Sequence, residues 1–312
     1  MKNSKYLTAM LGGILTASLM VGCIREDRSD CPPTLETRSV VVKVMDSVGG
    51  RDITESGEAG GAELYLFTRE GDYAGHVAIT NDDIMRHVPV RILGRDLDDC
   101  WLSVWTNTGT GQQFHVPDEG VGLEDRAVSL IVNDGEYHGI PDNMFFGRLQ
   151  LASSVGTVPE VVTVMRKNAR MHITVRGLDA AFPGERYYFT VRTPDDGYDF
   201  NGNPMTGEAT VRSAGMFDVY GDFSTTEAFN VIHTDPNASS EDNKVTVCVY
   251  EKSVSRAADR LVVSAVVDDD ETPISLPMGQ TVNLLIDISE NAGLSVRTEI
   301  TPWNEIYQWE SW

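Results

Sequence analysis

The residue with the clearest chemistry in this 312-residue sequence is Cys23. It follows Gly22 at the end of an apolar stretch, residues 7–19, which Lys2 and Lys5 precede. A basic start, a short apolar segment and a small residue before the cleavage point are typical of a secretory signal peptide. A cysteine in the next position is typical of lipoproteins, whose thiol is acylated before the chain is cut. We therefore predict a signal peptide that ends at Gly22 and a lipidated Cys23. The alternative is an ordinary signal peptide followed by an accidental cysteine.

The mature chain predicted in this way begins with an acidic tether, residues 23–35. Two or three acyl chains on one residue give stable membrane attachment, whereas a single chain is marginal. No later stretch reaches the roughly 18 apolar residues that a transmembrane helix needs. The run from Ile24 to Asp30 resembles the export signal that sends lipoproteins of Bacteroidetes-type bacteria to the outer face of the outer membrane; the alternative is a plain solvated linker. We expect a lipid-anchored, surface-exposed protein of the outer membrane.

The rest of the chain contains none of the common catalytic motifs. The sequence has no G-x-S-x-G elbow, no H-E-x-x-H pair, no phosphate-binding loop and no clustered Cys/His metal spacing. The six histidines are scattered, and carboxylate pairs arise by chance among 47 acidic residues. Because no motif supplies a nucleophile, a base and an orienting group together, we predict no catalytic residues and no cofactor. A secreted hydrolase with unrecognised carboxylates is the enzymatic alternative.

Calcium is the small ligand for which the sequence offers the best candidate. Residues 195–203 cluster oxygen-bearing side chains with an Asp-x-Asn-x-Asn core. An EF-hand would need Gly at its sixth position and Glu at its twelfth, but Pro204 and Thr210 stand there. We therefore predict a long turn in which the Asp and Asn side chains bond their own backbone. Residues 268–271, three Asp and one Glu, are likewise predicted as an exposed hairpin turn, so no metal site is predicted.

Acylation of Cys23 would leave three cysteines, an odd number, in an oxidising compartment. Cys31 precedes the first predicted strand and Cys100 begins a strand of the same predicted domain. A Cys31–Cys100 disulfide would tie the membrane tether to that domain, although connectivity cannot be deduced from sequence. Cys248 lies in an apolar strand and is predicted to be a buried free thiol.

The composition of the chain argues against a nucleic-acid partner and against a largely disordered chain. The chain carries 25 Lys and Arg against 47 Asp and Glu, a formal net charge of −22. Binding to nucleic acid needs clustered basic residues, so nucleic acid is not an expected partner. Hydrophobic residues make up 41% of the chain, which is enough for packed cores.

The elements that must hold these residues are predicted to be β-strands throughout. Apolar and polar residues alternate in short segments bounded by Gly, Asp, Asn and Pro, and no helical periodicity longer than two turns follows the signal peptide. Two groups of seven to nine strands predict two tandem β-sandwiches, over residues 36–155 and 156–312. The long run over residues 158–177 is interpreted as one strand with a bulge or bend at residues 166–170.

Several segments together resemble the FimB/Mfa2 family of fimbrial anchor lipoproteins. The most specific is the stretch from Cys23 to Cys31-Pro32, a lipidated Cys, an acidic tether and then Cys-Pro. The other segments are Ala62–Phe67 with Glu70-Gly71, Asp142–Gly147, Val164–Ile173, Thr281–Ser289, Asn291-Ala292-Gly293 and Glu299–Asn304. The resemblance implies two transthyretin-like (immunoglobulin-like) sandwiches. It also implies a non-catalytic role at the base of a fimbria, holding the shaft to the outer membrane and influencing its length.

The candidate attachment point for such a shaft is the C-terminal stretch, residues 294–312. Sandwich proteins with an open edge accept or donate a strand, and main-chain hydrogen bonds then supply the affinity. The candidate partner-binding residues are Val296, Thr298, Ile300, Trp303, Tyr307, Trp309 and Trp312. Alternatively, this stretch simply closes the second sandwich, or the first strand, residues 37–45, is exchanged instead.

A surface glycan-binding lipoprotein is the competing function from another class. Trp101 and Trp105 share one face of a predicted strand because side chains alternate with period two. We predict that this face belongs to a sandwich core. Tryptophans exposed in a row would instead favour glycan binding.

Overall fold

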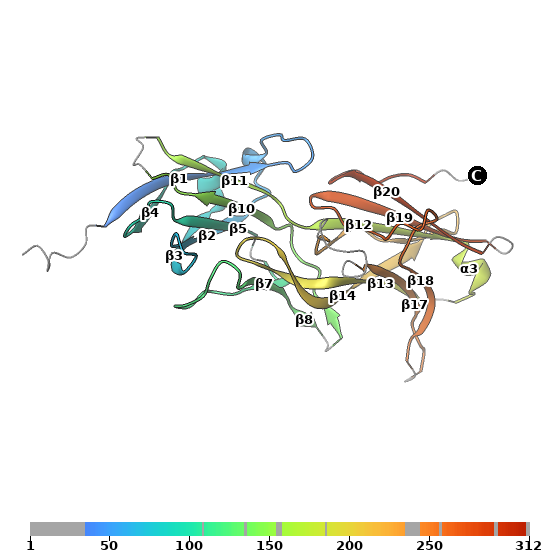
Figure 1. Cartoon of the computed structure of the whole chain (residues 1–312). Helices are drawn as coiled ribbons and strands as arrows, with labels where there is room; N and C mark the ends of the chain where they lie inside the picture. Colours follow the sequence, from blue (N-terminus) through green and yellow to red (C-terminus); the bar gives the residue numbers. More distant parts are fainter. Residues whose placement is uncertain are drawn as a thin grey trace, which may run out of the picture. The chain divides into compact units, whose positions relative to one another are not determined.

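The computed structural model describes residues 35–107, 109–133, 136–153, 158–184, 186–234, 244–255, 258–289 and 293–309. Every element below lies in the unit formed by Glu36–Trp312. The chain is all-β, as predicted, with two sets of paired strands (Figure 1). The described helical segments are η2 (Thr54–Ser56), α2 (Asn81–Met85) and α3 (Leu178–Ala181).

The first set is a seven-stranded sheet in the order β3-β2-β5-β10-β11-β1-β4. Its strands are β1 (Glu36–Met45), β2 (Gly61–Phe67), β3 (Tyr73–Thr80), β4 (Val90–Gly94), β5 (Trp101–Thr106), β10 (Phe145–Gln150) and β11 (Glu160–Arg166). In β1 the alternate residues Val40, Val42 and Val44 are buried, which is the period-two pattern of the sequence. β1 pairs with β11 in parallel and with β4 antiparallel, so it is bonded on both sides.

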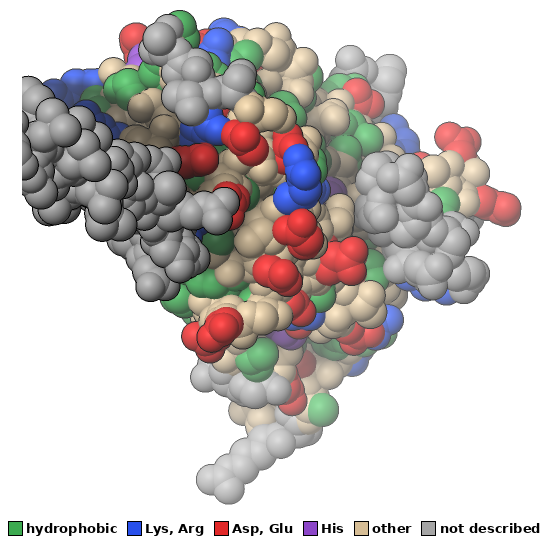
Figure 2. All heavy atoms as spheres, turned by 60° about the vertical axis from the view of Figure 1, so that its left-hand side comes forward, with side chains coloured by type: hydrophobic (Ala, Val, Ile, Leu, Met, Phe, Trp, Pro, Cys, Tyr) green, Lys and Arg blue, Asp and Glu red, His purple; other side chains and the backbone are tan. Residues whose placement is uncertain are grey.

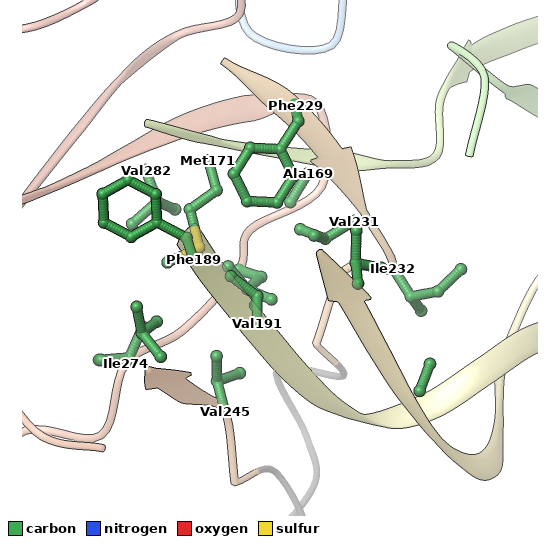
Figure 3. Close-up of a cluster of buried hydrophobic side chains, with 14 of the residues drawn as sticks. Ala169, Met171, Phe189, Val191, Phe229, Val231, Ile232, Val245, Ile274 and Val282 are labelled. Atoms are coloured by element: carbon green, nitrogen blue, oxygen red, sulfur yellow. The ribbon is translucent and has the colours of Figure 1, made fainter. Parts of the chain in front are cut away.

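The second set has thirteen strands, with the main order β18-β17-β13-β14-β15-β12-β19-β20. These are β12 (Ala169–Arg176), β13 (Tyr187–Asp199), β14 (Pro204–Phe217), β15 (Phe223–Thr225), β17 (Thr246–Glu251), β18 (Arg260–Ala265), β19 (Gln280–Ser289) and β20 (Gly293–Pro302). The remaining strands are β6 (Gln112–Phe114), β7 (Arg126–Leu130), β8 (Val132–Asn133), β9 (Tyr137–His138) and β16 (Phe229–Val231). Met171 and Val282 pack with Phe189 in the buried core (Figure 3).

Strand pairing differs from the expected division at residues 155 and 156. β11 joins the first sheet through β1, and β12 joins the second through β19, so residues 158–177 hold two strands rather than one bent strand. Asn168 is fully buried in the connection between β11 and β12. Its Oδ1 accepts a hydrogen bond from Met144 N at 2.7 Å, and its backbone O accepts one from Gly279 N at 2.7 Å, so both bonds fix this connection. Conversely, β7 lies within residues 36–155 of the first predicted domain but pairs with β13 of the second sheet. Alternation is the same in both strands, so it could not reveal which neighbours they join.

Aromatic side chains from both sheets share one core. Trp105 of β5 is fully buried, with its ring centroid 5.5 Å from that of Tyr198 at the end of β13. The ring of Tyr65 lies edge-on to Phe200 at 5.2 Å, and Ser103 Oγ donates to Phe200 O at 2.6 Å. The prediction that Trp101 and Trp105 face a core is confirmed, since Trp101 packs against this cluster half-buried. The two sheets are therefore joined by packed side chains as well as by strand pairing.

A short helix, α2, lies between β3 and β4. Thr80 caps α2, since its Oγ1 accepts a hydrogen bond from Asp83 N at 3.2 Å. A helix of five residues is too short to produce a readable 3.6-residue pattern. The strand β4 then starts at Val90.

His233 makes stability depend on pH. Its Nδ1 lies 3.0 Å from the hydroxyl of buried Tyr198, and burial, with the charge of Lys167 as a smaller cause, lowers the pKa of His233 to about 3. An unfolded histidine titrates near pH 6.5, so the unfolded state binds the extra proton between the two values. Stability contributed by neutral His233 is therefore present above about pH 6.5 and is lost as the pH falls toward 3.

We expect His233→Gln to remove this part of the pH dependence. Urea unfolding measured from pH 4 to pH 6 should show a stability slope that is smaller in the variant by up to about 1.4 kcal/mol per pH unit. Parallel stability curves for the parent and the variant would show that His233 takes up its proton equally well in the folded state.

Candidate partner-binding edge at the C-terminal strand

The predicted partner-binding residues belong to β20 and the segment that follows it. β20 is the last strand in the order of its sheet and pairs antiparallel with β19 from Gln280↔Pro302 to Ser289↔Gly293. Its other side is a sheet edge, where alternate N–H and C=O groups point away from β19. An open edge of this kind is where an additional strand can pair.

One face of β20 is divided between the core and the solvent. Val296 is buried and packs in the core of the second sheet. Thr298 is half-buried, and Ile300 is 45% exposed. Val296 therefore holds the strand in its own sheet, whereas Ile300 is free to meet a partner.

A turn covers the N-terminal half of the β20 edge. Asp269 N donates to Val296 O at 2.8 Å, and Asp269 Oδ1 accepts from Val296 N at 2.7 Å. Asp269 Oδ2 also accepts from Ser295 Oγ, and these hydrogen bonds lower the pKa of Asp269. The turn itself is formed by Asp268, whose carboxylate accepts from the N–H of Asp270 and of Thr272. The predicted turn at residues 268–271 is confirmed, and it closes the part of the edge around Val296.

Trp303 ends β20 as a buried anchor. The guanidinium groups of Arg166 and Arg170 lie 4.7 Å and 5.2 Å from the centroid of its ring. Its backbone O accepts from Arg170 Nη1 at 3.1 Å and from Thr281 Oγ1 at 2.7 Å. Arg166 belongs to the first sheet, where it also forms an ion pair with Glu58. Trp303 therefore contacts both sheets and is only 6% exposed.

The chain beyond Trp303 folds back over the outer face of β19 and β20. Tyr307 N donates to Asn283 Oδ1 at 3.0 Å, and the guanidinium of Arg297 lies 5.6 Å from the ring of Trp309. The rings of Tyr307 and Trp309 meet edge to face at 4.8 Å. Tyr307 stays 40% exposed.

The structure thus separates the seven predicted residues. Val296 and Trp303 are buried within the chain itself, and Ile300 and Tyr307 form the exposed part. Thr298 and Trp309 are half-buried, and Trp312 lies outside the described residues. The sequence did not identify Asp269 as a residue that covers the β20 edge. The only sign of it was the acidic turn that precedes the last two strands.

The predicted cysteine chemistry falls mostly outside the described part of the chain. Cys23 and Cys31 both lie there, so acylation and the Cys31–Cys100 bridge remain predictions. Cys100 is a buried free thiol whose Sγ donates to Asp96 O at 3.2 Å, and burial raises its pKa. The prediction for Cys248 is confirmed, since it too is a buried free thiol.

Only the end of the acidic segment at residues 195–203 forms the predicted turn, because residues 195–199 belong to β13. Asp199 Oδ1 accepts from Asn203 N at 2.7 Å, and Asp199 Oδ2 accepts from Asn203 Nδ2 at 3.0 Å. Asp196 forms an ion pair with Arg126. Within the described ranges, no group of three or more His, Cys, Asp or Glu side chains is placed to hold a metal ion. No helix in the same ranges is both long and apolar enough to span a membrane.

Comparison with known proteins assigns this fold to a family. The family model for the fimbrillin-A associated anchor proteins Mfa1 and Mfa2 matches residues 28–309. The chain belongs to the Mfa2 family. The resemblance seen in the tether and in the scattered strand motifs is thereby confirmed.

Relatives of this Mfa2-family chain are similar over nearly their whole length. The major fimbrium anchoring subunit FimB of Porphyromonas gingivalis is 22% identical, over 97% of this chain and 96% of FimB. The fimbrial anchor protein Mfa2 of the same species has a TM-score of 0.61 at 12% identity, over 86% of this chain and 98% of Mfa2. A structure of proposed polysaccharide-binding proteins from Bacteroides thetaiotaomicron has a TM-score of 0.60 at 13% identity, over 87% of this chain and 98% of that one. At such low identity the two structures establish a shared fold.

Proposed function

We propose that this chain is the lipid-anchored base subunit of a fimbria and that it attaches the shaft to the outer membrane and influences its length. The observation that carries the proposal is the Mfa2-family match, which runs from within the acidic tether to the C-terminal tail. The relative FimB, named as an anchoring subunit, is similar over the same extent. The role is assembly and not catalysis.

The position of β1 supports an anchoring role. β1 begins at Glu36, directly after the tether that Cys23 would fix to the membrane. Because β1 is bonded to β11 on one side and to β4 on the other, pulling it out requires two ladders to break. Force applied through the tether would therefore act on a strand that is hydrogen-bonded on both sides.

The shaft is proposed to attach at the opposite end of the sequence. Exposed Ile300 belongs to the part of β20 whose edge Asp269 leaves open, and exposed Tyr307 follows in the tail that contacts β19. The first strand is the weaker candidate for exchange, since β1 already pairs on both sides. Strand addition at β20 would give main-chain hydrogen bonds from the open edge and specificity from those two side chains.

Glycan binding remains the second candidate because one protein of the same fold bears that name. A row of exposed tryptophans would favour it. In the described part of the chain, however, Trp105 and Trp303 are buried, and the guanidinium of Arg148 covers the ring of Trp101 at 3.8 Å. These residues favour the anchoring role.

Deleting Ile306–Trp312 is expected to release fimbriae into the medium while the lipoprotein stays folded and membrane-bound. The deletion removes Tyr307 and Trp309 but leaves the buried anchor Trp303 in place. Outer membranes should be solubilised and the chain immunoprecipitated, with the shaft protein detected in the precipitate and in the medium. The parent chain should bring down a fimbrillin-type shaft protein, and the deletion variant should not.

The matched control removes two exposed hydrophobic side chains elsewhere. Val219 and Tyr220, in the turn between β14 and β15, are 93% and 82% exposed. Val219→Ala/Tyr220→Ala should leave attachment unchanged. Shafts of normal length that stay attached after the deletion would place the interface elsewhere. Failure of the parent chain to bring down any shaft protein, together with its retention on a polysaccharide column, would support the glycan-binding candidate.

A further inference from the structure

The outer edge of β3 differs in length and charge from the edges of β4, β6, β8 and β18. β3 lies at the end of the first sheet and pairs only with β2, from Gly61↔Thr80 to Phe67↔Tyr73 (Figure 1). A bridge between Asp72 and Gly122 and a hydrogen bond from Tyr73 N to Val121 O occupy only its first residues. From Ala74 onward, no described strand pairs with it on the side away from β2.

Natural proteins protect sheet edges with charges, prolines, bulges, short strands or covering segments. β4 has five residues, follows Pro89 and carries an exposed Arg91. β18 begins with Arg260, and its ladder with β17 contains a bulge. Asp269 covers the N-terminal half of the β20 edge, and β6 and β8 have only three and two residues.

β3 has few of these protections. Its eight residues include no Lys, Arg, Asp, Glu or Pro, and its register shift lies at the Tyr73 end. Alternate residues, among them Val77, pack inward against the first core, and α2 and β4 also contact the strand. A long uncharged edge supported in this way is a template for another strand.

The charges around this edge indicate which kind of strand would bind. A hollow of about 750 Å³ lies at the Tyr73 end, and four carboxylates line it against one guanidinium, that of Arg148. The carboxylates belong to Glu70, Asp72, Glu124 and Asp125. At the Thr80 end are Asp82 and Asp83, with Arg86 paired to Asp82. Acidic side chains gather on the face turned toward the viewer in Figure 2.

A second copy of this chain is a poor occupant for electrostatic reasons. Antiparallel contact of two β3 edges would bring the hollow of one copy beside Asp82 and Asp83 of the other. Like charges in such a contact repel, and each chain carries a net charge of −22. A partner strand with basic ends would instead place opposite charges together.

We propose that the β3 edge binds an extended segment of another protein, uncharged in its middle and basic at its ends, by β-strand addition. The main-chain groups of β3 supply the hydrogen bonds, and the acidic hollow beside Tyr73 receives a Lys or Arg that flanks the added strand. This interface is separate from the β20 edge and does not depend on the proposed fimbrial role.

The test uses synthetic peptides and the chain from residue 24 onward, which lacks the acylated cysteine. A fluorescent nonapeptide with a Thr-Val repeat between two terminal lysines is titrated by anisotropy. Its comparison peptides carry terminal glutamates, or the same lysines with N-methylated alternate amides that cannot donate hydrogen bonds. We expect binding of the first peptide and at least tenfold weaker binding of the other two. Hydrogen exchange should show new protection within residues 74–80.

Variants of the protein locate the site independently. Ala78→Lys places a charge on the exposed side of β3 and should weaken binding at least tenfold. The control Leu261→Lys changes a 51% exposed residue of the β18 edge and should leave binding unchanged. Equal binding of lysine-ended and glutamate-ended peptides, or protection at β20 or β18 in place of β3, would overturn the proposal. So would a dimer of the protein alone that protects β3.

Discussion

Replacing Trp303 with alanine is expected to lower the free energy of unfolding by about 3–5 kcal/mol, the range measured for large buried aromatic residues. The indole is buried against the guanidinium groups of Arg166 and Arg170, and its removal takes away the aromatic ring from both cations. It also loosens the contact that the end of β20 makes with the first sheet. Urea unfolding followed by circular dichroism gives the change in midpoint at constant m-value.

Tyr307→Ala is the matched control for this prediction. Tyr307 lies four residues further along the same segment but is 40% exposed, so its loss should cost about 1 kcal/mol or less. Trp303→Phe should recover part of the stability because a smaller ring still offers a face to the two guanidinium groups. Equal effects of the alanine variants at 303 and 307 would contradict the assignment of Trp303 as the buried anchor.

Cys23→Ala is expected to abolish lipidation and to move the protein from the outer membrane into soluble fractions or leave an unprocessed precursor. The expectation rests on the signal-peptide pattern that ends at Gly22-Cys23, because acyl chains on Cys23 would supply the attachment. In cells that assemble fimbriae, the shafts should then be shed together with their base. Metabolic labelling with a fatty-acid analogue and fractionation of the membranes measure both effects.

Cys248→Ala serves as the control because it changes a buried thiol of the second sheet. This variant should keep the fatty-acid label and its place in the membrane. Label retained by Cys23→Ala would refute acylation at that residue. If the parent protein is labelled and membrane-bound but does not bring down a shaft protein, the proposed lipid anchor stands and the proposed fimbrial partner is refuted.

The sequence by itself determined the fold class and the family of this protein. Alternation with period two in β-branched and aromatic segments depends only on local geometry, so the first strand, expected over residues 37–45, agrees with β1 nearly to the residue. The tether motif and the strand motifs were likewise sufficient to recognise the Mfa2 family. The turn at Asp268 was predictable because Asp side chains bond their own backbone locally.

Only the tertiary structure decided which strands become neighbours and which side chains they bury. Residues 158–177 alternate without a break, yet β11 and β12 join different sheets, because pairing depends on hydrogen bonds to strands far away in the sequence. From the sequence, Trp303 was a candidate partner-binding residue. The structure instead buries it against Arg166 of the first sheet. The unpaired edge of β3 and the half-covered edge of β20 differ for the same reason. A sequence records the alternation of each strand, but whether an edge is free depends on what the rest of the chain places beside it.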